Sequence, residues 1–350
     1  MLLKEYREQL LDLILNFLWR EWSALGVLGQ SAGEERWVID PEPLLVFSLQ
    51  LARYEPRLFD EILAWLETNG KWLDVARLRH IIRRQDENTV RVVGGSVVFM
   101  LAHGNERKWL NLAKYCEQRY IAQPAAGWQE VLFKEKSGKD YPPAVNNNDP
   151  DFLLFEINRQ KIHVQKEARE VPVNASSNLR FMLRALFGVG GKSEILLYLM
   201  THEAARPKEI AADIGLFWLG VQQTVSDMSK SGLVLTRQNG KRLEYRVLQN
   251  KWWEFVSPGI QESSRPKWLD WNAIFAALYG LWTTVDAISD NSVSEYMKGS
   301  RLQDSLEKLA MEFGRAGIAV GNPPSPGLPP ELQQAAALNF ISGVLGATNG

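Results

Sequence analysis

The sequence predicts a mainly α-helical protein of several domains: an N-terminal helical bundle, a central module of three helices and a β-hairpin, and C-terminal helices. Apolar residues recur at spacings of three and four through most of the chain, which is the period of an amphipathic helix. Two segments on either side of Asn239-Gly240 instead have the pattern of paired strands. At 350 residues the chain also exceeds the usual size of a single domain.

The composition is that of a folded, soluble protein, with 45% hydrophobic and 23% charged residues. The net charge is -1, so any binding of a polyanion requires a local patch of positive charge. The single cysteine, Cys116, permits no internal disulfide, and the four histidines lie too far apart for metal-ligand spacing. The longest uncharged apolar stretch, residues 274–282, is far shorter than the ~20 residues of a membrane span. We therefore expect a cytoplasmic protein without membrane insertion, metal or cofactor.

Local signals place the helices of the N-terminal bundle, which we assign to residues 1–133. An extended stretch, Trp37–Ile39, precedes Asp40-Pro41, a helix cap followed by proline at the first helical position. The expected helices are Leu3–Trp22, Pro41–Arg53, Pro56–Glu67, Leu73–Arg84, Glu87–His103 and Glu106–Arg119.

Changes in composition divide the rest of the chain. The predicted segments are a linker at 134–176, a central domain at 177–256, C-terminal helices at 257–320, and a Pro/Gly-rich tail with a short helix at 321–350. The C-terminal helices are expected at Trp268–Ile288 and Val293–Phe313, and the tail helix at Glu331–Leu345. Because Trp268–Ile288 is strongly apolar, it is a candidate for dimerisation.

Start and stop residues mark three helices in the central domain. Ser193 is placed to cap the first helix, Pro207 opens the second, and Gly215 supplies the turn before the third. The third helix ends at Ser231-Gly232, because glycine is preferred just past a helix end. Its inward positions are Val221, Thr224, Val225 and Met228, and its outward positions are Gln222, Gln223, Ser226 and Lys230.

A hairpin follows the third helix. Asn239-Gly240 is the strongest short-range signal for a two-residue turn between strands. A turn on these two residues places Arg237 opposite Arg242, and like charges directly opposite each other destabilise a ladder. A phosphate backbone would offset this repulsion, and Lys241 would add a third positive charge at the tip. Alternatively, the arginines simply extend into water.

This order of three helices and a basic hairpin resembles the winged helix-turn-helix domains of MarR and ArsR type transcriptional regulators. The resemblance covers about 57 of the 350 residues, from Lys192 to Leu248. It implies that the third helix enters the major groove and the hairpin lies along the DNA backbone. The implied base-reading residues are Gln222, Gln223 and Ser226, and the implied phosphate contacts are Lys230, Arg237, Lys241 and Arg242.

The start of the third helix departs from that pattern. Where those families have polar residues, this chain has Phe217-Trp218-Leu219-Gly220, which is apolar and offers no capping side chain. The resemblance places Trp218 against DNA. In the alternative interpretation Phe217, Trp218 and Leu219 pack on a protein partner, as in a scaffold or an antitoxin-like protein. The segment from Lys192 to Glu254 contains nine Lys or Arg and seven Asp or Glu. This excess of positive charge is small for a DNA-binding domain.

A second basic run lies in the N-terminal bundle. It comprises Lys71, Arg77, Arg79, His80, Arg83, Arg84 and Arg91. It is either a second phosphate-contacting surface or a solvated helix face paired with Asp74, Asp86 and Glu87.

Two other patterns carry no expected chemistry. Gly191-Lys192-Ser193 matches the end of a phosphate-binding loop, but Leu186 stands where that motif needs glycine and a helix precedes it. Cys116 is expected to be a small buried residue. With no catalytic constellation, we expect a non-enzymatic, DNA-binding transcriptional regulator that acts as a dimer, the protein-interaction scaffold being the alternative.

Overall fold

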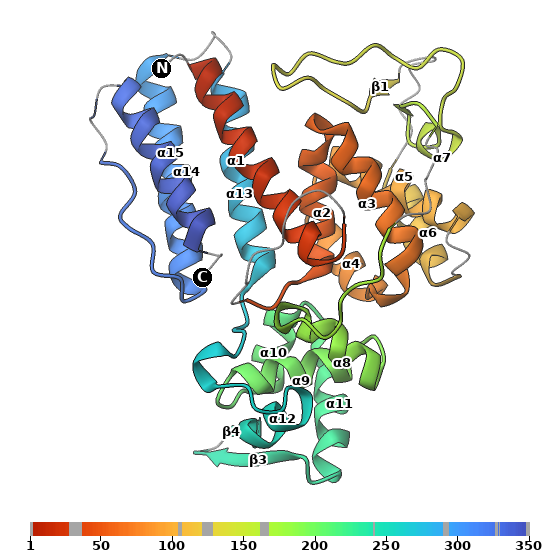
Figure 1. The fold of residues 1–350 in the computed structure, drawn as a ribbon, viewed down its shortest axis with the longest axis vertical. Helices are drawn as coiled ribbons and strands as arrows, with labels where there is room; N and C mark the ends of the chain where they lie inside the picture. The colour runs from red at the N-terminus through yellow and green to blue at the C-terminus, as the bar shows by residue number, and fades with distance from the viewer. Residues whose placement is uncertain are drawn as a thin grey trace.

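The computed structural model describes residues 3–27, 37–103, 107–120, 129–161, 168–240, 242–289, 294–325, 328 and 330–347. Over these residues the protein is mainly helical, with fifteen α-helices and two small two-stranded sheets (Figure 1). Within the same residues, no helix combines the length and apolar content that a membrane span requires. The high helical content of the described residues confirms the predicted, mainly helical fold class.

The first hydrophobic core unites the N-terminal and C-terminal helices. These helices are α1 (Leu3–Ala24), α2 (Pro41–Leu51), α3 (Pro56–Asn69), α4 (Val75–Ile82), α5 (Glu87–His103), α6 (Leu110–Arg119), α7 (Pro150–Leu153), α13 (Trp271–Ile288), α14 (Glu295–Arg315) and α15 (Pro330–Ala347). Apart from the four-residue α7, they begin and end within a few residues of the predicted positions. Helices α14 and α15 pack on the outer side of α1 and α13 (Figure 1).

The apolar face of α13 is covered within the chain. Trp271 and Phe275 are buried, and their rings contact Phe17 of α1 and, for Phe275, Phe47 of α2 at a centroid distance of 4.9 Å. This apolar face of α13 is therefore not exposed for dimerisation in the single chain. The physical reason is that α1 and α2 already supply matching apolar faces.

The predicted linker also contributes to this core. Strands β1 (Glu130–Val131) and β2 (Ile157–Asn158) form a short parallel pair that the sequence did not indicate. Phe155 lies directly over Gly94 of α5, where a side-chain carbon would come within 2.4 Å of the ring. Glycine at this position thus permits the close approach of the segment to the bundle.

A second hydrophobic core holds the central domain. It contains α8 (Leu179–Phe187), α9 (Gly191–Thr201), α10 (Pro207–Ile214), α11 (Trp218–Lys230), β3 (Val234–Asn239), β4 (Arg242–Val247) and α12 (Gln249–Val256). Residues 191–247 are called the helix–hairpin module below. The predicted turn at Gly215 is confirmed, since its φ is +70°. The predicted cap at Ser193 is wrong: Gly190 occupies the cap, and the Ser193 hydroxyl donates to its carbonyl.

Six buried ionised side chains join the two cores. This ionic cluster consists of Asp40, Glu42, Arg77, Arg180, Arg184 and Glu194, each at most 5% exposed. Arg180 lies 3.0 Å from Asp40, and Arg184 lies 2.7 Å from both Glu42 and Glu194. Three positive and three negative charges balance, which a buried cluster requires because an unpaired charge is costly away from water.

The cluster corrects two sequence expectations. Asp40 precedes Pro41 at the start of α2 as predicted, but its carboxylate binds Arg77 and Arg180 instead of capping the helix. Arg77 was expected at the surface, yet it is buried and its Nε donates to the carbonyl of Ile214 at 2.8 Å. That bond ties α4 directly to the end of α10.

Removing one charge from this cluster should destabilise the protein. We expect Glu194→Gln to lower the free energy of unfolding by about 3 to 5 kcal/mol, because two buried arginines lose their shared partner. Urea unfolding followed by circular dichroism measures the change. Arg315→Ala, which removes an exposed pair with Glu312, is the control and should remain near wild type. Equal effects of the two substitutions would contradict the prediction.

The same cluster should make stability depend on pH. Burial opposes ionisation of Glu194, but Arg180 and Arg184 outweigh it and hold the pKa of its carboxyl below the ordinary value. A lowered folded pKa gives stability that is complete above the unfolded pKa, about 4.3, and is lost as pH falls through the folded pKa. We expect the stability gap between wild type and Glu194→Gln to be constant from pH 7 to 5 and to narrow below about pH 4. A constant gap down to pH 3 in urea titrations would contradict this.

Candidate nucleic-acid interface

Helix α11 presents the outward face that the sequence predicts. Val221 and Val225 are buried beneath it, whereas Gln222, Gln223 and Lys230 are exposed. The remaining predicted position, Ser226, is half-buried. Phe217 occupies the helix cap without a capping side chain, as expected.

Trp218 lies in a groove between α11, the start of α10 and strand β4. We call this the hairpin-side groove; it has a volume of about 330 Å³. Its lining residues are Arg206, Pro207, Lys208, Trp218, Gln222, Arg242, Leu243 and Tyr245. Trp218 is 38% exposed, and the Lys208 ammonium lies 5.3 Å from its ring centroid. A cation over an indole face is favourable, so this contact positions both side chains.

The cations of the hairpin-side groove differ in how far they are neutralised. Arg206 binds Glu209, three residues later on α10, at 2.9 Å from its Nε. Lys208 and Arg242 form no ion pair with any carboxylate in the described part of the chain. The groove therefore carries uncompensated positive charge beside an exposed aromatic ring.

The hairpin register differs from the prediction. Arg237 lies opposite Glu244, and Arg242 lies opposite Asn239. The turn falls later than expected, because Asn239 pairs with Arg242, and Gly240 follows Asn239 with a φ of +61°. Lys241 lies outside the described residues. The physical reason for the difference is electrostatic: this register replaces a repulsive arginine pair with an attractive arginine–glutamate pair.

Three of the predicted DNA contacts are held by acidic neighbours. Arg237 binds Glu244 at 2.9 Å and Glu203 at 2.8 Å. Lys230 binds Asp227 at 2.7 Å, and Gln223 donates to the same carboxylate at 3.0 Å. Both bonds lower the pKa of the Asp227 carboxyl, and the bond from Lys230 has the larger effect. The structure thus gathers Trp218, Gln222 and Arg242 in one groove and leaves Gln223, Ser226, Lys230 and Arg237 outside it.

Sequence reasoning missed Arg206 and Lys208. Both flank Pro207 at the start of α10, and a signal for them was present: two basic residues around a helix-opening proline. The apolar residues that suggested a protein partner are also at the surface, since Phe217 is 68% and Leu219 is 51% exposed.

The basic run of the bundle is divided between surface and interior. Arg77 and Arg91 are buried in ion pairs, Arg91 with Glu130, whereas Arg79, Arg83 and Arg84 are exposed. The basic run is therefore neither a fully solvated helix face nor a single phosphate-contacting surface, because part of it is buried. The prediction for Cys116 is confirmed: it is buried, and burial raises the pKa of its thiol to about 12.

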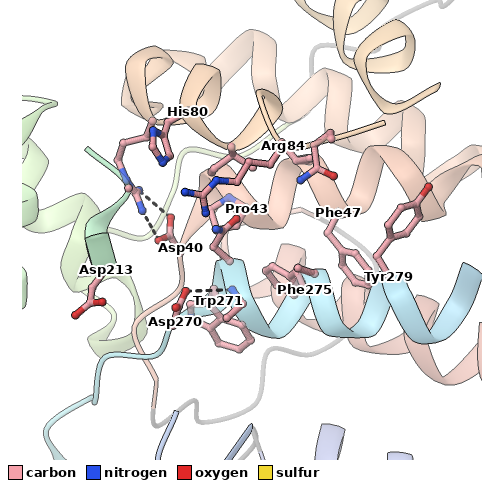
Figure 2. A pocket seen from close by; sticks show the side chains of 18 of the residues that line it. Asp40, Pro43, Phe47, His80, Arg84, Asp213, Asp270, Trp271, Phe275 and Tyr279 are labelled. Carbon is pink, nitrogen blue, oxygen red and sulfur yellow. Dashed lines mark hydrogen bonds and ion pairs between the residues drawn. The ribbon is translucent and has the colours of Figure 1, made fainter. Parts of the chain in front are cut away.

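A larger cleft of about 530 Å³ separates the bundle, the module and α13. In Figure 2, Asp40 lies in its wall and His80 and Arg84 extend from the α4 region; Asp213 and Asp270 also line the cleft. Because both carboxylates and cations line this cleft, its charge does not favour a polyanion.

Comparisons with protein-family models, with curated proteins and with solved structures find no match to this chain. The arrangement of its own side chains is therefore what supports a function.

The two hairpin arginines should differ in their effect on DNA binding. We expect Arg242→Ala to reduce the slope of log K against log salt for duplex DNA by about 0.9, the value for one phosphate contact. Arg237→Ala should change it less, because Glu203 and Glu244 already neutralise that guanidinium. Fluorescence anisotropy with a labelled duplex at several salt concentrations gives both slopes. A larger effect of Arg237→Ala would show that the assignment is reversed.

Proposed function

We propose that this protein binds double-stranded DNA through residues 191–247, used as a winged helix-turn-helix with α11 in the major groove and the β3–β4 hairpin as the wing. The order α9, α10, Gly215 turn, α11 and hairpin supports this assignment. In this arrangement the outward face of α11 meets base edges, and the start of α10 and the wing meet phosphates.

The hairpin-side groove carries the proposal. It brings three cations, Arg206, Lys208 and Arg242, around the exposed side of α11. No acidic residue is among the described residues that line it. Phosphate oxygens are the ligands that such a cluster recognises, and Arg242 offers a guanidinium that no carboxylate occupies.

Side chains of α11 would contact the bases and sugars of the duplex. Gln222 is exposed at the edge of the groove, and a glutamine amide can pair with both hydrogen-bonding groups of adenine in the major groove. Trp218 beside it presents an apolar ring, which suits contact with a thymine methyl group or a sugar. Gln223, Lys230 and Arg237 would contribute only after exchanging their acidic partners for DNA.

Regulation of transcription by a dimer belongs to the same proposal. Two copies would place two α11 helices in successive major grooves. Since the apolar face of α13 is covered within the chain, the dimer would use another surface.

Removing the groove cations together tests the function. We expect Arg206→Ala/Lys208→Ala/Arg242→Ala to reduce the salt slope of duplex binding by up to about 2.7, since each phosphate contact contributes about 0.9. The control is Lys4→Ala/Arg301→Ala/Lys308→Ala, which removes the same charge from exposed positions on α1 and α14.

Anisotropy titrations between low and moderate salt distinguish the outcomes. The proposal predicts a wild-type slope for the control and a reduced slope for the groove variant. Equal slopes for the two variants, or no salt-dependent binding by the wild-type protein, would refute it.

A second candidate function is a protein-interaction scaffold. The observation in its favour is the exposure of Phe217 and Leu219 at the start of α11. It predicts that Phe217→Ser/Leu219→Ser abolishes partner binding while Trp218 and the groove cations are dispensable. Trp218 is 38% exposed and has the Lys208 ammonium 5.3 Å from its ring centroid, and this basic surrounding favours DNA over the alternative.

A further inference from the structure

A second positively charged cleft lies on the other side of α11. This bundle-side cleft, of about 590 Å³, is formed by α4 and α6 of the bundle and by the start of α11. Arg79, Arg83 and Lys108 line it, with the half-buried His80 beside them. No aspartate or glutamate is among the described residues of its wall.

Contacts within the described residues hold Arg79 and Lys108 in place without pairing Arg79 or Arg83 with a carboxylate. The Arg79 guanidinium lies 4.9 Å from the centroid of the Tyr115 ring, and Lys108 donates to the carbonyls of Lys71 and Leu73. Neither Arg79 nor Arg83 forms an ion pair with a described carboxylate. The two arginines stand four residues apart on α4 and just past its end, a spacing at which like charges repel. An anion in the cleft would relieve this repulsion.

The nearby imidazole of His80 is affected by the positive charge of neighbouring arginines. The pKa of His80 is lowered by burial first and then by Arg84, Arg83 and Arg77. Arg77 points inward to the ionic cluster, so its charge is balanced there. Arg79 and Arg83 have no such ion pair among the described residues.

The two charged clefts lie on opposite sides of the exposed face of α11. Gly220 and Thr224 line the bundle-side cleft, whereas Trp218 and Gln222 line the hairpin-side groove. At 100° per residue, positions 220 and 222 are separated by about 200° around the helix. Gln223, which is exposed, lies between them. A helix in the major groove has one phosphate backbone on each side, about 12 Å apart.

We propose that the bundle-side cleft binds the second phosphate backbone of the duplex that α11 contacts, which makes the N-terminal bundle part of the DNA-binding surface. The proposal rests on the DNA-binding function above. Arg79 and Arg83 bind phosphate oxygens there, and Lys108 adds charge at the rim. The hairpin-side cations bind the other backbone, so that α11 is held from both sides.

The test compares two double variants in duplex binding. Arg79→Ala/Arg83→Ala should reduce the salt slope by about 1.8, because two phosphate contacts are lost. Arg84→Ala/Arg301→Ala removes the same charge and should leave the slope unchanged, since Arg84 lines the mixed-charge cleft and Arg301 lies on α14. Arg79→Gln/Arg83→Gln keeps longer polar side chains in case the alanine variant is unstable. It should reduce the salt slope by the same amount.

The outcomes separate this inference from the function on which it rests. A reduced slope for both cleft variants, with the control at wild type, supports it. If the cleft variants keep the wild-type slope while the groove variant loses it, the bipartite contact is refuted and the DNA-binding function stands. If the cleft variants lose only the binding of inorganic phosphate, the cleft is a small-anion site and the inference is refuted. If the wild-type protein binds no DNA, both proposals fail.

Discussion

The buried ionic cluster between the two hydrophobic cores is the interaction on which the arrangement of this protein depends. Asp40 and Glu42 come from the start of α2, and Glu194 comes from α9 of the module. Three arginines link them, and none of the six groups reaches enough water to be stable alone. The bundle and the module must therefore dock together, because separating them would leave each half with unbalanced charges facing the gap.

This docking also sets the surroundings of α11. Arg77 holds the carbonyl of Ile214, immediately before the turn at Gly215 that leads into α11. The orientation of α11 relative to α4 is thus fixed at a single buried contact. As a result the exposed arginines of the α4 region lie beside one flank of α11, while the start of α10 and strand β4 lie beside the other.

The charges on the module show why composition alone is a poor guide to an interface. The module has only a small excess of basic residues, but some of its cations are paired with carboxylates and others are not. Arg237 and Lys230 are each bound by carboxylates, whereas Lys208 and Arg242 form no ion pair with a carboxylate of the described residues. An anionic partner gains most from the latter group, since it replaces no existing ion pair. The two charged flanks of α11 consist largely of such residues.

Local sequence patterns predicted most of the helices, the three-helix order of the module, the turn at Gly215 and the presence of the hairpin, because apolar period and turn residues act over a few neighbouring positions. Four features emerge only in the folded chain: the hairpin register, the burial of Arg77, the cover over α13 and the grouping of Arg206 and Lys208 with Trp218. These features depend on ion pairs and packing between residues far apart in the chain. Such contacts act over a few ångströms in space, and local sequence patterns carry no record of them.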